Sequence, residues 1–408
     1  MTPSEPFLSR AARWLAFASA IAIMFSIAAS QILLALAFAA LLASGEKLRI
    51  PRIKWPLALF ILGTLISLAF SGNPAAGLPQ VRKFFVFLEL VVVFSALRDL
   101  RVVRWLFLTW AGIGAITALR GFVQFAGKVR EAHDLGRNFY EYYVSERITG
   151  FTSHWNTYSA EEMFALIMIG AYLLFAPRRR GAWLWVLCSV LMALAVLLGE
   201  TRGIWIAAAA AALYLLWFWR RWMVVLVPAV ALVAFAASPA SLRTRFTSIL
   251  RPAKIDSNQF RIVTWRTGLR MIERHPLLGL GPEGVKYHFD EYVPPDIPRP
   301  LPIGWYGHLH NIYLHYAAER GIPTMLVLIW LLFQVLYDCG RGLRALPPGP
   351  SDRRFLLHGT IAVVLATLVE GFVELNLGDS EVLTMFLVVV ACGYLALEKP
   401  EKEDVAAA

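Results

Sequence analysis

Apolar blocks separated by short polar segments make up most of the chain. A helix that crosses a bilayer needs about 20 mostly apolar residues, and about twelve blocks reach or approach that length. The second and fourth blocks are short, and they fit either tilted spans or half-spans that pair with a neighbour. The pattern predicts an all-α polytopic membrane protein with about twelve transmembrane helices. The blocks lie near residues 12–28, 29–44, 55–71, 84–97, 104–126, 158–176, 182–198, 203–219, 222–237, 323–338, 355–374 and 381–397.

Two longer polar segments interrupt this pattern, near residues 127–157 and 238–309. They predict three parts. The first is an N-terminal transmembrane bundle of about nine spans at residues 1–237, and the second is a partly helical loop at residues 238–309. The third part, residues 310–408, holds the C-terminal transmembrane helices and a cytoplasmic tail.

The basic residues give the predicted spans a direction. The chain has 408 residues, 58% of them hydrophobic, and a net charge of +11. Lys and Arg concentrate in alternate short loops, so the positive-inside rule makes those loops and both termini cytoplasmic. The two long polar segments then lie on the periplasmic face of a bacterial inner membrane. Because this topology accounts for the charge, we expect membrane lipids and no nucleic acid as partners. The basic clusters lie at residues 47–54, 98–104, 178–180, 220–221 and 341–354, with Arg10, Arg13, Lys399 and Lys402 near the ends.

The larger polar segment contains one stretch with helical periodicity, residues 259–274. The helix should end before His275-Pro276, because proline disfavours helix at the preceding residue. Three arginines at i, i+4 spacing form a stripe that faces water or lipid headgroups. Arg261 lies off this stripe, on the face of Trp265, and a cation on an apolar face needs a buried partner or a ligand. We expect Arg261 and Trp265 to contact a substrate, with a structural ion pair as the alternative for Arg261. The stripe consists of Arg266, Arg270 and Arg274.

Turn and breaker residues fill the rest of this segment. Three glycines follow the helix and predict a flexible turn. Five prolines between residues 294 and 302 exclude a helix there, and they predict an extended strap that leads to His308. The glycines are Gly279, Gly281 and Gly284.

Residues 308–314 concentrate polar chemistry at the start of an apolar block. Polar groups near lipid are costly, so this cluster indicates a reaction or binding site at a membrane surface. His310 can take a proton near neutral pH and is the candidate general base. Asn311 and Tyr313 are candidate substrate-binding residues. A metal site is the alternative, but offsets of two and seven residues do not place the three histidines on one helical face, so we expect no metal and no cofactor. The histidines are His308, His310 and His315.

Two more arginines lie at turns on the external face. Arg202 and Gly203 open a span directly after a tight turn, where glycine would let a headgroup approach the backbone. Guanidinium forks onto phosphate oxygens, so Arg202 is a candidate anion clamp. A snorkelling anchor or a salt bridge to Glu200 is the structural alternative. Arg147, at the end of the first external segment, is a candidate third anion contact.

Three motifs resemble those of the O-antigen ligase and Wzy-type polymerase superfamily. The first is Arg202-Gly203 at the start of a span, and the second comprises residues 256–265 and 274–281. The third is His310-Asn311, followed after nine residues by Gly321. The ligase form often ends in Gly-x-x-Gly-Thr-Pro, whereas this chain reads Gly-Ile-Pro-Thr from Gly321. The departure leaves ligase and polymerase as alternatives.

The resemblance implies a GT-C-type glycosyltransferase that needs no metal. Its donor would be a glycan on undecaprenyl diphosphate. The acceptor would be lipid A–core for an O-antigen ligase, or a second lipid-linked glycan for a polymerase of O-antigen or exopolysaccharide. By matching positions, Arg202 and Arg261 would bind the diphosphate, and His310 would activate the acceptor hydroxyl on the periplasmic face.

Two other classes of protein share some of these features. A lipid or solute transporter also has many spans and basic residues, but it should show interrupted paired spans and related halves. Here the polar residues gather at one face, and no half-repeat is visible. A structural scaffold of the cell-division type would not require Arg202, Arg261 and His310 together. The transferase hypothesis predicts that these three residues, distant in sequence, line one pocket.

Overall fold

The computed structural model describes residues 6–177, 181–238, 257–302 and 304–398, together with residues 243 and 247. Regular structure in these ranges is helical, and they contain no strand. The first half of the chain forms α1 (Phe7–Ala22), α2 (Ile27–Ala43), α3 (Lys54–Ala69), α4 (Pro74–Arg82), η1 (Lys83–Phe87), α5 (Leu88–Ala96), α6 (Leu100–Asp134), α7 (Phe139–Ser145) and α8 (Trp155–Phe175). The second half forms α9 (Ala182–Leu198), α10 (Arg202–Trp219), η2 (Arg221–Val225), α11 (Leu226–Ala237), α13 (Ser257–Arg274), α14 (Gly284–Tyr292), α15 (Ile312–Ala345), α16 (Asp352–Glu370), η3 (Asn376–Gly378) and α17 (Ser380–Leu397).

Each of the predicted apolar blocks lies on a helix. Among the described residues, five helices are long and apolar enough to cross a bilayer: α6, α8, α10, α15 and α17. Shorter apolar helices cover four more of the blocks. The described ranges are therefore all-helical and consistent with a polytopic membrane protein. The number of twelve spans stays a prediction.

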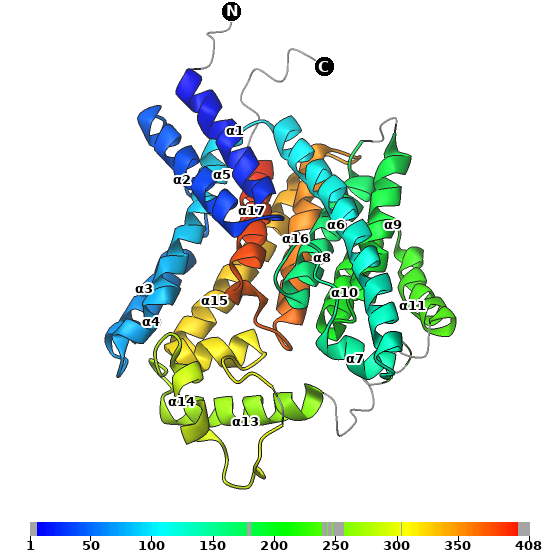
Figure 1. Cartoon of the computed structure of the whole chain (residues 1–408). Helices are drawn as coiled ribbons and strands as arrows, with labels where there is room; N and C mark the ends of the chain where they lie inside the picture. The colour runs from blue at the N-terminus through cyan, green and yellow to red at the C-terminus, as the bar shows by residue number, and fades with distance from the viewer. Residues whose placement is uncertain are drawn as a thin grey trace, which may run out of the picture.

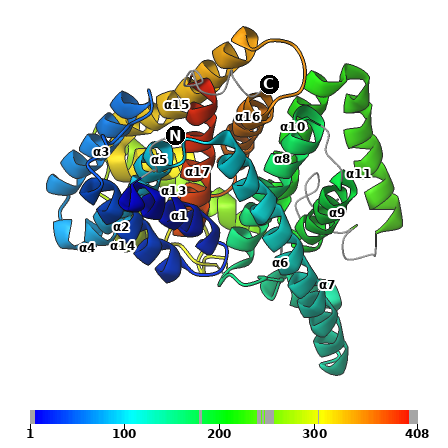
Figure 2. The same cartoon turned by 90° about the horizontal axis from the view of Figure 1, so that it is seen from above.

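The most deeply packed helices lie in the middle of the bundle. In the most apolar stretch of α8, 78% of the residues are buried inside the protein, and in that of α17 the share is 83%. Seen from above, α17, α16 and α8 lie between a group formed by α1 to α5 with α15 and a group formed by α9 to α11 (Figure 2). Figure 1 shows α13 and α14 at one end of this bundle, opposite the end where α1 begins and α17 finishes. The segment predicted as an external loop therefore covers one end of the bundle.

The other end of the bundle gathers the basic loops. Arg104 at the start of α6 pairs with Asp352 at the start of α16, with 2.6 Å between Nη1 and Oδ2. Arg98 pairs with Glu46 at 2.7 Å. Helix caps also form at this end, where Asp99 accepts a hydrogen bond from the Arg101 backbone N–H, which satisfies a donor that a helix start leaves open. The predicted basic residues 178–180, Lys399 and Lys402 lie outside the described residues.

The two polar segments predicted near residues 127–157 and 238–309 are more helical than expected. α6 continues to Asp134, and α7 and α14 form within stretches expected to be loops. α13 ends at Arg274, directly before His275-Pro276, as predicted. The proline-rich stretch 293–302 contains no helix, as predicted. It is not extended throughout, because the Ile297 N–H donates to the Pro294 carbonyl and closes a turn there. Two members of the arginine stripe bind this strap, because Arg266 pairs with Asp296 at 2.8 Å and Arg270 donates to the Val293 carbonyl.

A tight backbone contact joins the turn between α13 and α14 to α15. The helix breaks at Gly321, whose φ is 81°, and a Cβ there would lie 1.9 Å from the Leu277 carbonyl oxygen. At Gly279 a Cβ would lie 2.3 Å from the Glu319 backbone. Backbone hydrogen bonds donated by Leu280, Gly281 and Ile322 hold residues 276–281 against residues 318–322. The predicted flexible turn is thus fixed against α15, and its glycines are needed for the close approach.

Candidate functional site

A cavity of about 1070 Å³ opens between the external segment and the ends of the transmembrane helices. Residues from distant parts of the chain line it. Four of the predicted site residues are among them, and three are not. The four are Arg147, Arg202, Arg261 and His310.

One carboxylate joins two of the predicted residues. Glu374 lies in the loop after α16, and its side chain is 7% exposed. Its Oε1 accepts a hydrogen bond from Nη2 of Arg261 at 2.6 Å. Its Oε2 lies 3.0 Å from Nδ1 of His310. The Arg261 side chain thus forms the structural ion pair that was the alternative reading, and it also lines the cavity.

The charge state of Glu374 orders the ring of His310. Burial alone would raise the pKa of Glu374, but the hydrogen bond from His310 and the charge of Arg261 bring that pKa to about 2. At neutral pH the carboxylate is ionised and can only accept hydrogen bonds. Nδ1 of His310 therefore carries the hydrogen that points at Glu374. In the neutral ring this leaves Nε2 as a proton acceptor.

The backbone at His310 is strained. Its φ is +47°, in the left-handed region that residues other than glycine rarely adopt. The His310 N–H donates to Nδ1 of His308 at 3.2 Å, and the two rings lie 3.9 Å apart. Burial and the neighbouring His310 hold the pKa of His308 well below its usual range. His308 is therefore a neutral acceptor that supports the unusual backbone of His310, since strain of this kind persists only where surrounding contacts enforce it.

Asn311 fixes the start of α15 to the loop that carries Glu374, and Tyr313 fixes it to the last turns of α16. The side-chain Oδ1 of Asn311 caps α15 by accepting from the Leu314 N–H, and its Nδ2 donates to the Phe372 carbonyl at 3.0 Å. The Tyr313 hydroxyl donates to the Leu368 carbonyl at 2.7 Å. Neither side chain lines the cavity. The structure gives both residues a positioning contact, and the predicted contact with substrate is not seen in their placement.

Trp265 is also absent from the cavity lining. It lies on α13 one turn after Arg261, and its indole nitrogen is buried without a hydrogen-bond partner in the described part of the chain. Its predicted role in substrate binding therefore has no geometric support here.

Arg202 and Arg147 approach the cavity from the side of α10 and α8. Arg202 is the first residue of α10 and is 7% exposed. A Cβ at Gly203 would lie 2.7 Å from the Val373 side chain. That position is therefore filled by protein, and the expected approach of a headgroup to the Gly203 backbone is wrong. The Arg147 guanidinium stacks over the Trp155 ring at 4.9 Å, which directs it along the cavity wall.

The histidine cluster is not arranged as a metal site. Among the described residues, no group of three or more His, Cys, Asp or Glu side chains could hold a metal ion. His315 instead meets Glu319 one turn later, with 3.4 Å between Nε2 and Oε2. This pairing follows from the i, i+4 spacing on α15.

Sequence reasoning missed Glu374. It stands at the end of the apolar block 355–374, and its partners are 64 and 113 residues away. A signal was present, because Glu370 and Glu374 place two acids at one end of a predicted span. Acids at such a position need a partner. Two further lining cations, Lys83 and Arg320, were also missed.

Comparison with known families supports the resemblance seen in the motifs. The family model described as O-antigen ligase matches residues 187–329. No curated protein matches the chain. The match confirms the similarity to the O-antigen ligase and Wzy-type superfamily, whose members are glycosyltransferase-like enzymes of membranes. Arg202, Arg261 and His310 fall within the matched residues, whereas Arg147 and Glu374 lie outside them.

Proposed function

We propose that the protein transfers a glycan from undecaprenyl diphosphate to a hydroxyl group of lipid A–core on the periplasmic face of the inner membrane. One observation carries this proposal. Glu374 joins Arg261 to His310 at the wall of a cavity that Arg202 also lines. The arrangement puts a proton acceptor and two permanent cations around a single large space.

His310 is the general base in this mechanism. The acceptor hydroxyl loses its proton to Nε2 of His310 as its oxygen attacks the anomeric carbon of the donor sugar. The bond between that carbon and the diphosphate oxygen breaks, and the lipid diphosphate leaves with the electron pair. The imidazolium that forms is stabilised by the Glu374 carboxylate on Nδ1. A positioned base of this kind contributes about 10²–10⁴ in rate.

Arg202 and Arg261 stabilise the negative charge on the leaving diphosphate. Arg261 uses one amino group for Glu374, while its Nε is buried without a hydrogen-bond partner among the described residues. A guanidinium has five N–H donors, so it can bind a phosphate oxygen and a carboxylate together. Loss of one such pre-arranged donor costs about 10²–10³ in rate. Two guanidinium groups take the place of a divalent cation, so we expect EDTA to leave the rate unchanged.

The topology is consistent with a periplasmic site. The basic loops lie at one end of the bundle and the cavity at the other. The positive-inside rule assigns the basic end to the cytoplasm. The same groups would serve a Wzy-type polymerase equally well, because only the acceptor differs.

Reconstitution tests the reaction and separates these alternatives. The purified full chain is placed in liposomes with a glycan on undecaprenyl diphosphate and with lipid A–core as acceptor. Glycan attached to lipid A–core identifies a ligase, and lengthening of the lipid-linked glycan identifies a polymerase. His310→Ala should abolish either product while the protein still inserts and folds. If the wild-type protein forms neither product, the proposed reaction is wrong, and full transfer by His310→Ala would remove the base from the mechanism.

A further inference from the structure

Two stretches of chain form a wall of the cavity that the proposed mechanism does not use. One is the start of α8, and the other is the loop that leads into α17. Together they bring imidazole, hydroxyl, amide and carboxylate groups to the cavity. These groups suit the hydroxyls of a sugar, because each hydroxyl both donates and accepts hydrogen bonds. The residues used below are His154, Thr157, Asn376, Asp379 and Glu381.

Asp379 has a carboxylate that the fold leaves partly unused. It stands at the N-cap of α17, where an aspartate usually accepts from backbone N–H groups of the first turn. Its side chain makes no such cap bond. Oδ2 instead accepts from the Thr157 hydroxyl at 3.0 Å, and Oδ1 accepts no hydrogen bond from the described residues. Because capping does not explain this carboxylate, Oδ1 is available to a ligand.

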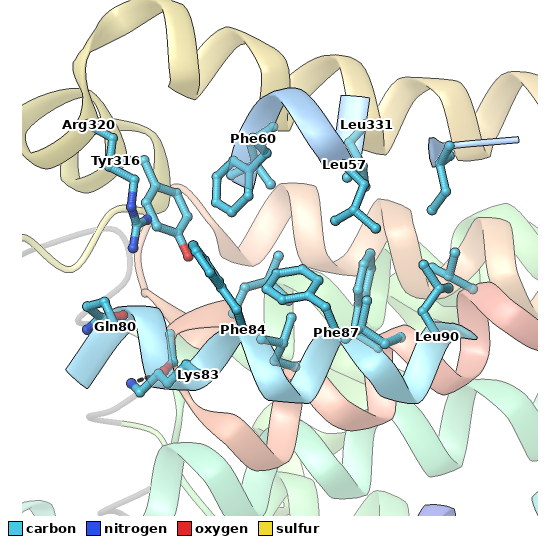
Figure 3. A pocket seen from close by; sticks show the side chains of 18 residues that line it. Leu57, Phe60, Gln80, Lys83, Phe84, Phe87, Leu90, Tyr316, Arg320 and Leu331 are labelled. Atoms are coloured by element: carbon cyan, nitrogen blue, oxygen red, sulfur yellow. Dashed lines mark hydrogen bonds between the residues drawn. The ribbon is translucent and has the colours of Figure 1, made fainter. Parts of the chain in front are cut away.

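Two contacts hold Asp379 and its loop in place. Thr157 is 3% exposed, so the packing of α8 fixes its hydroxyl. From the other side, the Lys83 ammonium donates to the Gly378 carbonyl at 2.8 Å. Figure 3 shows Lys83 across a neighbouring apolar pocket from Tyr316. The loop is therefore held at both sides, and a precise binding site requires such support.

His154 offers a hydrogen-bond donor on the same wall. Its Nδ1 accepts from the Asn156 backbone N–H at 3.2 Å, so in the neutral ring the hydrogen lies on Nε2. Burial lowers the pKa of His154, and the charges of Asp379 and Glu374 oppose that shift only in part. At neutral pH the ring is therefore uncharged, with Nε2–H as its donor. The charge of His310 also acts on this ring, so His154 lies near the candidate base.

A buried amide adds a second donor. Asn376 is 7% exposed and lines the cavity. Its Nδ2 lies beside Glu370 but makes no hydrogen bond of normal geometry in the described part of the chain. A buried donor without a partner is costly, so it indicates a ligand. The wall thus presents one carboxylate oxygen and two N–H donors.

We propose that Asp379, His154 and Asn376 form a subsite for a neutral sugar ring, with two neighbouring hydroxyl groups of that ring bound beside His310. One hydroxyl donates to Oδ1 of Asp379, and the other accepts from the N–H groups. Glu381 places a second carboxylate on the same wall, so a ring with its own carboxylate or phosphate is repelled. The inference rests on the proposed function, which supplies the ring from either the acceptor or the donor glycan.

Saturation-transfer NMR with two soluble probes tests the subsite. One probe is the oligosaccharide freed from lipid A–core, and the other is the glycan freed from undecaprenyl diphosphate. The protein is the full chain with His310→Ala in detergent, so that no transfer occurs. Addition of Asp379→Asn should weaken the binding of one probe by about tenfold, because a hydrogen bond to a charged group is worth about that factor or more. The probe that is affected shows whether the ring belongs to the acceptor or to the donor.

A change in the probe tests the selectivity. Oxidation of the terminal CH₂OH group to a carboxylate adds one negative charge to the ring. The oxidised probe should bind several-fold more weakly than the neutral one. Asp379→Asn should narrow this difference, because it removes a negative charge from the wall.

Matched variants separate binding from structure. Thr157→Val removes the hydroxyl that positions Asp379 and should weaken binding, whereas Thr157→Ser keeps that hydroxyl and should restore it. His154→Asn keeps a residue suited to cap α8 but withdraws the ring, so it tests the subsite without a change at Asp379. Asp134→Asn removes a carboxylate that is 80% exposed at the end of α6 and should have no effect.

Two results would overturn the proposal. One is unchanged affinity for both probes in Asp379→Asn and in His154→Asn. The other is equal affinity of the neutral and oxidised probes while Asp379 is intact. If Asp379→Asn lowers the melting temperature, His154→Asn decides the question alone. A failure of the proposed reaction looks different, because the probes would then bind in a way that depends on Asp379 while the wild type forms no product.

Discussion

Replacement of Glu374 by glutamine tests the link between Arg261 and His310. Glutamine keeps the size of the side chain but offers one acceptor and one amide donor instead of two acceptors. When the amide oxygen faces Arg261, the amide donor faces Nδ1 of His310. The ring then accepts on Nδ1 and carries its hydrogen on Nε2, which removes the base. We expect kcat for glycan transfer to fall by about 10²–10⁴, in line with loss of a general base, with a smaller change in KM.

The same replacement should lower stability. Folding shifts the pKa of Glu374 from 4.5 to about 2. At about 1.4 kcal/mol per pKa unit, the ionised form contributes about 3 kcal/mol to the free energy of unfolding. Because the folded pKa is the lower one, this contribution is present above pH 4.5 and is lost as the pH falls toward 2. The melting temperature of Glu374→Gln in detergent should therefore fall at neutral pH, and the difference from wild type should shrink in acid.

Two further variants make the Glu374 test specific. Glu374→Asp keeps the charge on a shorter side chain and should recover part of the lost kcat, which a purely structural role would not require. Asp290→Asn removes a carboxylate that is 80% exposed and should have no effect on kcat. Full transfer activity in Glu374→Gln, with unchanged kcat and KM, would refute the reasoning that the carboxylate orders His310.

Three other predictions follow from the geometry. Arg261→Lys should lower transfer by about 10²-fold or more in the reconstituted assay, because lysine keeps the charge but cannot bind a carboxylate and a phosphate through one planar fork; normal activity would reduce Arg261 to a structural ion pair. Gly321→Ala should lower the free energy of unfolding by about 2–5 kcal/mol, because of the left-handed φ and the clash with a backbone carbonyl. Gly340→Ala in the same helix should be neutral or stabilising, because a Cβ there meets nothing within 4 Å. Thermal unfolding of both variants measures the difference. A cysteine that replaces Asp290 should react with an impermeant maleimide from the periplasmic side, and a cysteine that replaces Arg101 should not. The background should be low, because all three native cysteines are buried. The reverse labelling pattern would invert the proposed topology.

The sequence predicted the helices well because lipid leaves the backbone few alternatives. Every apolar block became a helix, since a chain in hydrocarbon must satisfy its own N–H and C=O groups. The end of α13 at Arg274 was also predictable, because His275-Pro276 is a local signal. By contrast, α14 and α7 formed where the sequence indicated loops, because short helices in polar segments depend on packing more than on their own periodicity.

The candidate site was only partly predictable. His310, Arg202 and Arg261 were identifiable because each is a polar residue in an unusual local setting. Their arrangement was not, because it depends on Glu374, which is joined to them only through the fold. Asn311 has the same local polarity as its neighbour, yet it caps α15 and holds the Phe372 carbonyl. Residue type and spacing do not distinguish a side chain that faces a cavity from one that faces the backbone.

The glycine contact between residues 276–281 and the break in α15 has a consequence for how the protein can be inactivated. This contact holds the segment that carries α13 and α14 against the start of α15. Arg261 of α13 and His310 both meet Glu374, so displacement of that segment would separate them from the carboxylate. This contact is therefore a point at which a molecule bound to that end of the bundle could disturb the site without entering the lipid.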